Sequence, residues 1–100
     1  MADQQPASRV TVVDVPAKHR YEATVDGQLA GFVRYRELPG AVELIHTEVD
    51  PAFEHHGVGT ALAVFALDDV RAKGRAVVAT CPFIASYVKH HPEYQDLLAR

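Results

Sequence analysis

The sequence contains a single cysteine, Cys81, among its 100 residues. One cysteine excludes a disulfide within the chain, and such sparing use of cysteine is typical of a reducing compartment. Long apolar runs are also lacking, since the longest, Ala61 to Leu67, is far too short to span a bilayer. The first nine residues, MADQQPASR, hold no apolar stretch of the signal-peptide kind. These absences predict a small cytoplasmic protein with no membrane partner.

The chain also lacks an excess of positive charge. Ten Lys and Arg stand against thirteen Asp and Glu, which gives a formal net charge of −3. Nucleic acids are bound by basic stripes or patches, and none is present, so we expect no nucleic-acid partner. Hydrophobic residues make up 48% of the sequence, too many for a disordered chain. We expect a single domain over residues 9–100, preceded by a disordered tail at residues 1–8.

The first half of the sequence predicts an antiparallel meander. Residues 20–25 alternate between apolar and polar, as a half-buried strand does. The pair Asp26-Gly27 then favours a type I′ hairpin turn, and Leu38-Pro39-Gly40 marks a second turn. Strands are expected at Val10–Val15, Arg20–Val25, Leu29–Arg36 and Ala41–Val49.

The second half predicts a parallel β-α-β unit and a C-terminal helix. Helical spacing of apolar residues begins at Val58 and runs to about Lys73. Ala76–Cys81 is an unbroken apolar run, as expected of a strand buried on both faces. A strand, a helix and a strand with short connections imply a right-handed parallel crossover. Pro82 suits the start of a second helix that reaches about His90, and residues 93–100 form a short last helix or tail. The predicted class is α+β with a mixed sheet.

The turn before the first helix is a candidate anion site. It reads Glu54-His55-His56-Gly57-Val58-Gly59, where glycines at a helix N-terminus let a phosphate approach unpaired backbone N–H groups. A simple tight turn is the alternative, since glycine also serves that purpose.

His46 and Glu48 are candidates for acid–base chemistry. Period-two alternation puts them on one strand face, about 6–7 Å apart along the strand, together with Val42 and Leu44. An imidazole and a carboxylate facing the same way can deprotonate an amine, directly or through water. The alternative is an ordinary solvated strand end.

Cys81 and Tyr87 each have two interpretations. A cysteine at a helix start has its thiolate favoured by the helix dipole, yet free cysteine also packs as a small buried hydrophobe. Tyr87 lies one turn after Phe83, which is equally consistent with packing. The doublets His55-His56 and His90-His91 do not predict a metal site, because adjacent side chains do not converge on one point.

Taken in order, these motifs resemble those of the GCN5-related N-acetyltransferases. The stretches that carry the resemblance are Ile45-His46-Thr47-Glu48-Val49, Gly57-Val58-Gly59, and Cys81-Pro82-Phe83 with Tyr87. It covers roughly residues 10–97 and looks closest to the small, single-domain YjdJ-type subgroup. The resemblance implies that the mixed sheet holds acetyl-CoA as cosubstrate in a wedge where the fourth and fifth strands splay apart.

The resemblance also implies roles for individual residues. Val49 matches the strand end whose backbone meets the pantetheine arm, and its N–H would polarise the thioester carbonyl. Tyr87 matches a tyrosine that protonates the departing thiolate, and Cys81 a cysteine near the acetyl group. Glu48 or His46 would accept the amine proton. The pyrophosphate cradle matches His55, His56, Gly57, Val58, Gly59 and Thr60.

Two departures from the family pattern leave the activity open. Glu54 and His55 stand where the family usually has Arg or Gln followed by Gly. His55, His56, or basic residues such as Arg71 and Lys73 could compensate for the missing charge. The helical pair that usually builds the acceptor pocket is also missing, which leaves an open side for a protein or peptide amine, or for a small molecule such as a polyamine. The sequence therefore predicts an acetyl-CoA-dependent N-acetyltransferase, acting by direct attack or through Cys81. The alternative is a non-catalytic acetyl-CoA-binding or protein-interaction module.

Overall fold

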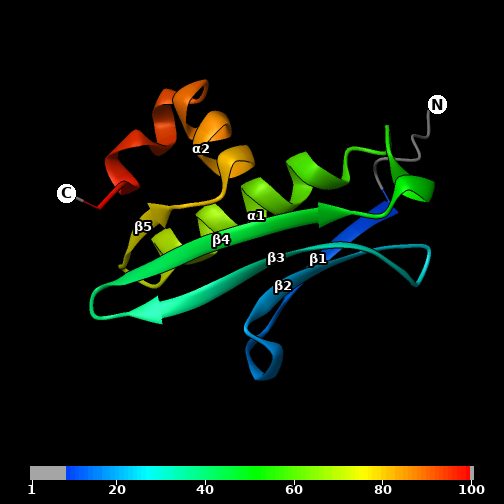
Figure 1. Ribbon diagram of the computed structural model, residues 1–100, viewed down its shortest axis with the longest axis horizontal. Coiled ribbons are helices and arrows are strands. Elements are labelled where there is room, and N and C mark those ends of the chain that lie inside the picture. Colours follow the sequence, from blue (N-terminus) through cyan, green and yellow to red (C-terminus); the bar gives the residue numbers. More distant parts are fainter. Residues whose placement is uncertain (1–8, 100) are drawn as a thin grey trace.

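The alternating and β-branched segments form one five-stranded sheet with strand order β1-β2-β3-β4-β5 (Figure 1). The computed structural model describes residues 9–99, so the tail predicted at residues 1–8 lies outside the described residues. Strands β1 to β4 pair antiparallel, whereas β4 and β5 pair parallel. The predicted α+β mixed sheet is thus confirmed. The strands are β1 (Val10–Val15), β2 (Arg20–Val25), β3 (Gln28–Leu38), β4 (Ala41–Val49) and β5 (Ala76–Ala79).

The hairpin between β2 and β3 has the predicted turn. Asp26 and Gly27 have φ of 51° and 84°, the pair of positive values that a type I′ turn requires. β3 is longer than the prediction at both ends, because Gln28 pairs with Val25 of β2 and Leu38 pairs with Ala41 of β4.

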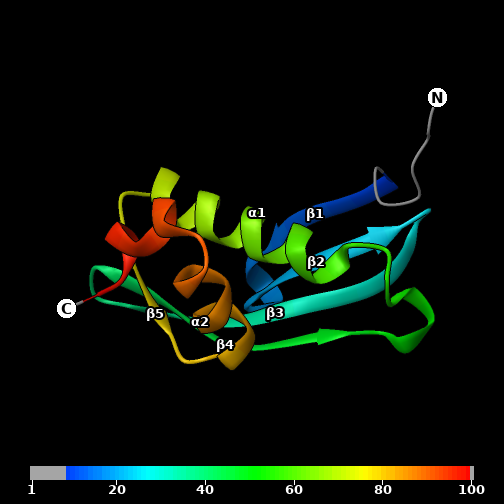
Figure 2. The same cartoon turned by 90° about the horizontal axis from the view of Figure 1, so that it is seen from above.

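Both α-helices lie on one face of the sheet (Figures 1 and 2). α1 (Val58–Ala72) packs across all five strands, and α2 (Pro82–Lys89) packs on β4 and β5. Together with the sheet they enclose a single apolar core that includes Tyr21, Leu44, Leu62 and Ile84. Among residues 9–99 no helix covers the other face of the sheet, which we call the open face.

A register shift in β4 overturns one prediction. Arg34 pairs with His46 and Tyr35 with Leu44, so Ile45 has no partner on β3 and forms a β-bulge. Strict alternation would place Val42, Leu44, His46 and Glu48 on one face. The extra residue instead leaves Val42 and Leu44 buried under the helices and turns His46 and Glu48 to the open face.

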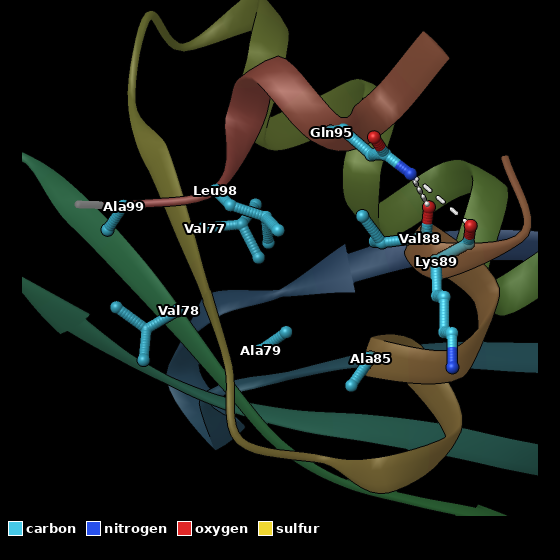
Figure 3. A pocket seen from close by; sticks show the side chains of 9 residues that line it. All are labelled: Val77, Val78, Ala79, Ala85, Val88, Lys89, Gln95, Leu98 and Ala99. Carbon is cyan, nitrogen blue, oxygen red and sulfur yellow. Dashed lines mark hydrogen bonds between the residues drawn. The ribbon is translucent and has the colours of Figure 1, made fainter. Parts of the chain in front are cut away.

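β5 is an edge strand, not a strand buried on both faces as predicted. It ends at Ala79, and Val77 is its only fully buried residue, because in residues 9–99 helices cover only one face of the sheet and no further strand pairs beyond β5. The C-terminal segment partly covers that edge: a 3₁₀ helix at Pro92–Leu97 leads to Ala99, whose N–H donates to Val77 O at 2.8 Å. Figure 3 shows the apolar hollow of about 780 Å³ that β5, α2 and this segment enclose.

Neither helix in the described part of the chain is long and apolar enough to cross a membrane.

Candidate active site

The site is built around a gap between β4 and β5. Their parallel ladder ends at the pair Leu44 and Ala79, after which Cys81 N–H donates to Leu44 O at 2.9 Å and the chain turns into α2. β4 continues alone to Val49, so its last residues have no neighbouring strand on this side (Figure 1). The splay predicted from the family resemblance is therefore present.

The free edge of β4 directs backbone groups into this gap. Asp50 N–H donates to Ala30 O on β3 at 2.8 Å, which fixes which residues face β3. Because N–H and C=O directions alternate along a strand, Thr47 and Val49 present theirs toward the gap.

The N-terminus of α1 opens beside Val49. Gly57 caps the helix with a φ of 77° and no side-chain hydrogen bond, so the first-turn N–H groups remain available to an anion. An open hollow of about 340 Å³ lies at this point, large enough for part of an extended ligand. Its lining consists of Val49, Phe53, Glu54, His55, Gly57, Val58, Gly59, Thr60 and Phe83.

Two glycines let the start of α1 pack closely against β3 and against Phe83 of α2. A Cβ on Gly31 of β3 would lie 2.5 Å from Glu48 O and 3.2 Å from a methyl group of Val58. A Cβ on Gly59 would lie 3.1 Å from the ring of Phe83 on α2. Gly31 therefore lets the start of α1 sit tightly against the sheet, and Gly59 lets the Phe83 ring close the side of the hollow.

Histidines and one carboxylate replace the expected cationic side chains here. The lining of the hollow contains no Lys or Arg. His55 has a φ of 70°, in the region that favours glycine, which agrees with its place at a family glycine position. His56 packs edge-on against Phe53, and its buried Nδ1 has no partner within the described residues. His56 does not line the hollow itself.

The basic residues suggested as substitutes lie elsewhere. Arg71 is about 17 Å along the axis of α1 from Thr60, and it binds Asp96 at 3.0 Å. Lys73 follows near the same end and binds Asp69 and Asp14. Neither can reach the helix N-terminus, so that part of the prediction is wrong.

Cys81 faces the gap from the start of α2. Its side chain is only 2% exposed, and Sγ lies 3.2 Å from Thr47 Oγ1 on β4. The contact spans the splay, so the thiol is held against the free edge of β4.

His46 and Glu48 form a pair on the open face, with Nε2 and Oε2 3.0 Å apart. Both are well exposed, at 52% and 63% of the side chain. Phe32 lies edge-on to His46, and the guanidinium of Arg20 covers the Phe32 ring at 4.6 Å. The predicted pairing of imidazole and carboxylate is present, on the side of the sheet away from Cys81 and the hollow.

Tyr87 is separate from both groups. Its ring stacks on His91 at a centroid distance of 3.8 Å, and His91 Nδ1 lies 2.7 Å from Tyr87 O. Phe83, one turn earlier on the same side of α2, lines the hollow, whereas Tyr87 does not.

Sequence reasoning missed three residues of this site. Thr47 carries no motif of its own, and its partner Cys81 is distant in sequence. Phe83 was noted only as part of a motif, and its exposure of 41% and its place beside the hollow are visible only in the structure. Gly31 could have been found, because a glycine inside a strand often marks a close approach of another backbone.

Comparison with known proteins agrees with this geometry. A family described as GCN5-related N-acetyl-transferase has a model that matches residues 20–97. The chain is 32% identical over 94 residues to protein NATD1 of Xenopus tropicalis, which covers 92% of this chain and 86% of that protein.

Two solved structures share the fold. The NMR solution structure of a GCN5-like protein from Staphylococcus aureus matches with a TM-score of 0.68 at 19% identity, over 92% of this chain and 90% of that chain. The ribosomal-protein-S18-alanine N-acetyltransferase of Escherichia coli matches with a TM-score of 0.60 at 20% identity, over 86% of this chain and 66% of that chain. At these identities the structural matches establish the fold alone.

Proposed function

This chain belongs to the GCN5-related N-acetyltransferase family, whose members are acyltransferases that use acetyl-CoA as cosubstrate, and we propose that it moves an acetyl group directly to an amine. The observation that carries the proposal is the meeting of two features at Val49: the free edge of β4, and the hollow at the start of α1, whose N-cap Gly57 makes no side-chain hydrogen bond. The free edge of β4 suits a pantetheine arm, and the hollow at the start of α1 suits a pyrophosphate.

Backbone groups supply most of the proposed cosubstrate site. The first-turn N–H groups after Gly57 face an anion, and the helix dipole favours its negative charge. His55, which lines the hollow, and the nearby His56 can add imidazole donors there. The free edge of β4 at Thr47 and Val49 suits the amide-rich arm, and Phe83 offers an apolar wall.

The proposed chemistry uses groups on both sides of the gap. The amine nitrogen forms a bond to the acetyl carbon while the bond from that carbon to sulfur breaks. Glu48 takes the amine proton, directly or through His46 or water, and Tyr87 gives a proton to the departing sulfur. The N–H of Val49 stabilises the negative charge that develops on the carbonyl oxygen.

Burial of Cys81 favours direct attack over an acetylated cysteine. Its thiol is 2% exposed and already has Thr47 as a partner, whereas cysteine nucleophiles usually lie in partly exposed sites. We expect Cys81→Ala to keep most of the activity. Appearance of an acetyl adduct on the intact protein, lost in Cys81→Ala together with the activity, would establish the covalent route instead.

A module that binds acetyl-CoA without turnover is the second candidate. It is favoured by the absence of Lys and Arg from the hollow and by the stacking of Tyr87 on His91. Both candidates predict thermal stabilisation by acetyl-CoA, and only the enzyme predicts release of free CoA thiol when amines are added.

The deciding experiment compares Glu48→Gln with Glu37→Gln. Glu37 is an exposed glutamate of β3 that pairs with Arg75, away from the gap, which makes it a matched control. Loss of general-base catalysis is expected to lower kcat by about 100-fold or more in Glu48→Gln and to leave Glu37→Gln unchanged. Thermal stabilisation by acetyl-CoA, with no release of free CoA thiol in the presence of any amine tested, would contradict the proposed enzyme and support the binding module.

A further inference from the structure

Arg34 occupies the centre of the open face, next to the proposed base. It lies on β3 directly opposite His46 of β4 and opposite Arg20 of β2. Three basic side chains therefore form a row across the sheet, with Arg34 between the other two. Cross-strand neighbours have Cβ atoms about 5 Å apart, so Arg34 and His46 are within reach of one small ligand.

Arg34 differs from its neighbours in having no counter-ion among residues 9–99. Arg20 binds Glu22 at 2.7 Å, and Arg36, the next arginine on the same face, binds Glu43 at 2.8 Å. Of the Lys and Arg side chains in residues 9–99, Arg34 and Lys89 alone have no carboxylate within 4 Å. Like charges directly opposite each other on a sheet are unfavourable, so nothing in the described fold explains an unpaired arginine at this position.

A second feature borders the same pair from the other direction. An open hollow of about 250 Å³ begins at Glu48 and extends along β3 away from Arg34. Its walls include Leu29, Phe32 and Pro51, and Leu29 is 47% exposed. The open face thus offers a hollow with an apolar wall at Leu29 and Phe32 and the Asp50 carboxylate at its far end, then the carboxylate and imidazole of Glu48 and His46, then the guanidinium of Arg34.

We propose that the acceptor is an amine that also carries a carboxylate, which Arg34 binds while the amine lies at His46 and Glu48. The inference rests on the proposed function and names its acceptor class. Guanidinium and carboxylate match in shape and form two parallel hydrogen bonds. The hollow beside Phe32 takes an apolar group of the same acceptor. Polyamines should be poorer acceptors than amines with a carboxylate, because Arg34 attracts a carboxylate and repels an additional positive charge.

The test compares pairs of acceptors that differ only in the carboxylate. In the first pair, leucine carries the carboxylate on the reacting residue and leucinamide has an amide there. In the second pair, leucyl-aspartyl amide carries the carboxylate on the next residue and leucyl-asparaginyl amide has an amide there. Since amidation also changes the basicity of the leucine amine, the quantity compared is the ratio of kcat/KM within each pair, in the wild type and in each variant. Arg34→Gln removes the charge, and Arg36→Gln is the matched control on the same face.

We expect Arg34→Gln to reduce the ratio of kcat/KM for the carboxylate member to kcat/KM for the amide member about fivefold to tenfold in one pair. Arg36→Gln should leave this ratio unchanged. The pair that responds shows whether the carboxylate belongs to an amino acid or to an acidic peptide. An unchanged ratio for both pairs, or an equal loss in Arg36→Gln, would overturn the proposal.

A binding measurement separates this proposal from the proposed function. In the CoA-loaded protein, the Arg34 side-chain Nε–H signal in ¹⁵N NMR is expected to shift with a carboxylate member of a pair and not with its amide. No shift, or equal shifts, would overturn the role of Arg34 whatever the turnover. A shift with the carboxylate member alone, combined with no release of CoA from acetyl-CoA in the presence of any acceptor, would contradict the enzyme and leave the acidic ligand established.

Discussion

At the scale of single residues, Gly31 is a point where the start of α1 packs tightly against the sheet. The position on β3 is buried, and an added Cβ would lie 2.5 Å from the backbone oxygen of Glu48. Backbone atoms of a paired strand cannot move aside as a flexible side chain can. Gly31 therefore sets the distance between the free end of β4 and the start of α1, which are the two halves of the proposed cosubstrate site.

Replacing Gly31 by alanine is expected to cost about 2 kcal/mol of unfolding free energy, because overpacking a well-packed interior forces backbone shifts. The variant also widens the gap between Val49 and Val58, so its acetyl-CoA affinity should fall. Urea unfolding measures the first effect and calorimetric titration the second. A variant as stable as the wild type would show that the sheet gives way easily here.

Gly59→Ala is the matched control for this change. Its Cβ meets the ring of Phe83, which is 41% exposed and free to move, rather than a backbone atom. We expect stability within about 0.5 kcal/mol of the wild type, as for most surface substitutions, and weaker binding of acetyl-CoA.

At the scale of elements, local signals in the sequence predict most of the fold. The alternation of residues 20–25 predicts β2, the pair Asp26-Gly27 predicts the hairpin turn, and helical spacing from Val58 predicts α1. Each signal acts within a few residues of the chain. Gly57-Val58-Gly59 likewise predicts a helix start with free N–H groups, and the structure has one.

Features that depend on distant partners were not predicted. Ile45 is β-branched and apolar and fits either face, so no local signal marks the bulge that separates Leu44 from His46. The edge position of β5 depends on the absence of a sixth strand beside Val77 in the described chain. The contact of Thr47 with Cys81 arises only where β4 and β5 splay, which is a property of two strands together.

Glu43 links three strands and should give the fold a dependence on acidic pH. Its carboxylate on β4 accepts from Thr80 Oγ1 just after β5 at 2.6 Å and from Arg36 Nη2 on β3 at 2.8 Å. The hydrogen bond from Thr80, followed by that from Arg36, lowers the pKa of Glu43 below its ordinary value of 4.5. A carboxylate with a lowered folded-state pKa stabilises the fold above its ordinary pKa, and this contribution is lost as the pH falls through the lowered value.

We therefore expect Glu43→Gln to be less stable than the wild type at pH 7 and to lose less stability as the pH falls below the ordinary glutamate value of 4.5. Thermal unfolding across this range measures both effects. Glu37→Gln, which changes an exposed glutamate on β3, should follow the wild-type curve. Parallel curves for Glu43→Gln and the wild type would refute the linkage.

At the scale of the whole molecule, three tyrosines tie distant segments together through carboxylates. Tyr21 donates to Asp69 of α1 at 2.8 Å, Tyr35 donates to Asp14 of β1 at 2.7 Å, and Tyr94 donates to Asp68 of α1 at 2.9 Å. Lys73 joins the first two pairs, because its ammonium group lies within 3.1 Å of both Asp14 and Asp69. β1, β2, β3 and α1 thus share one polar network, and the Tyr94–Asp68 pair separately ties the C-terminal segment to α1.

These tyrosine–carboxylate hydrogen bonds predict how the protein responds to alkali. Burial, followed by hydrogen bonding to a carboxylate, raises the pKa of Tyr94 to about 12 and those of Tyr21 and Tyr35 further. A tyrosine with a raised folded-state pKa stabilises the fold fully below its ordinary value of 10, and this contribution is lost as the pH rises through the raised one. Tyrosinate absorbance should therefore lag behind that of free tyrosine and then rise together with the loss of circular dichroism.

Tyr21→Phe should lower stability at pH 7 by about 1 kcal/mol, the usual worth of one hydrogen bond, and remove one late-ionising group. If all the tyrosines ionised near pH 10 while the circular dichroism stayed unchanged, the hydroxyls would be free of these carboxylates and the network would not hold the elements together.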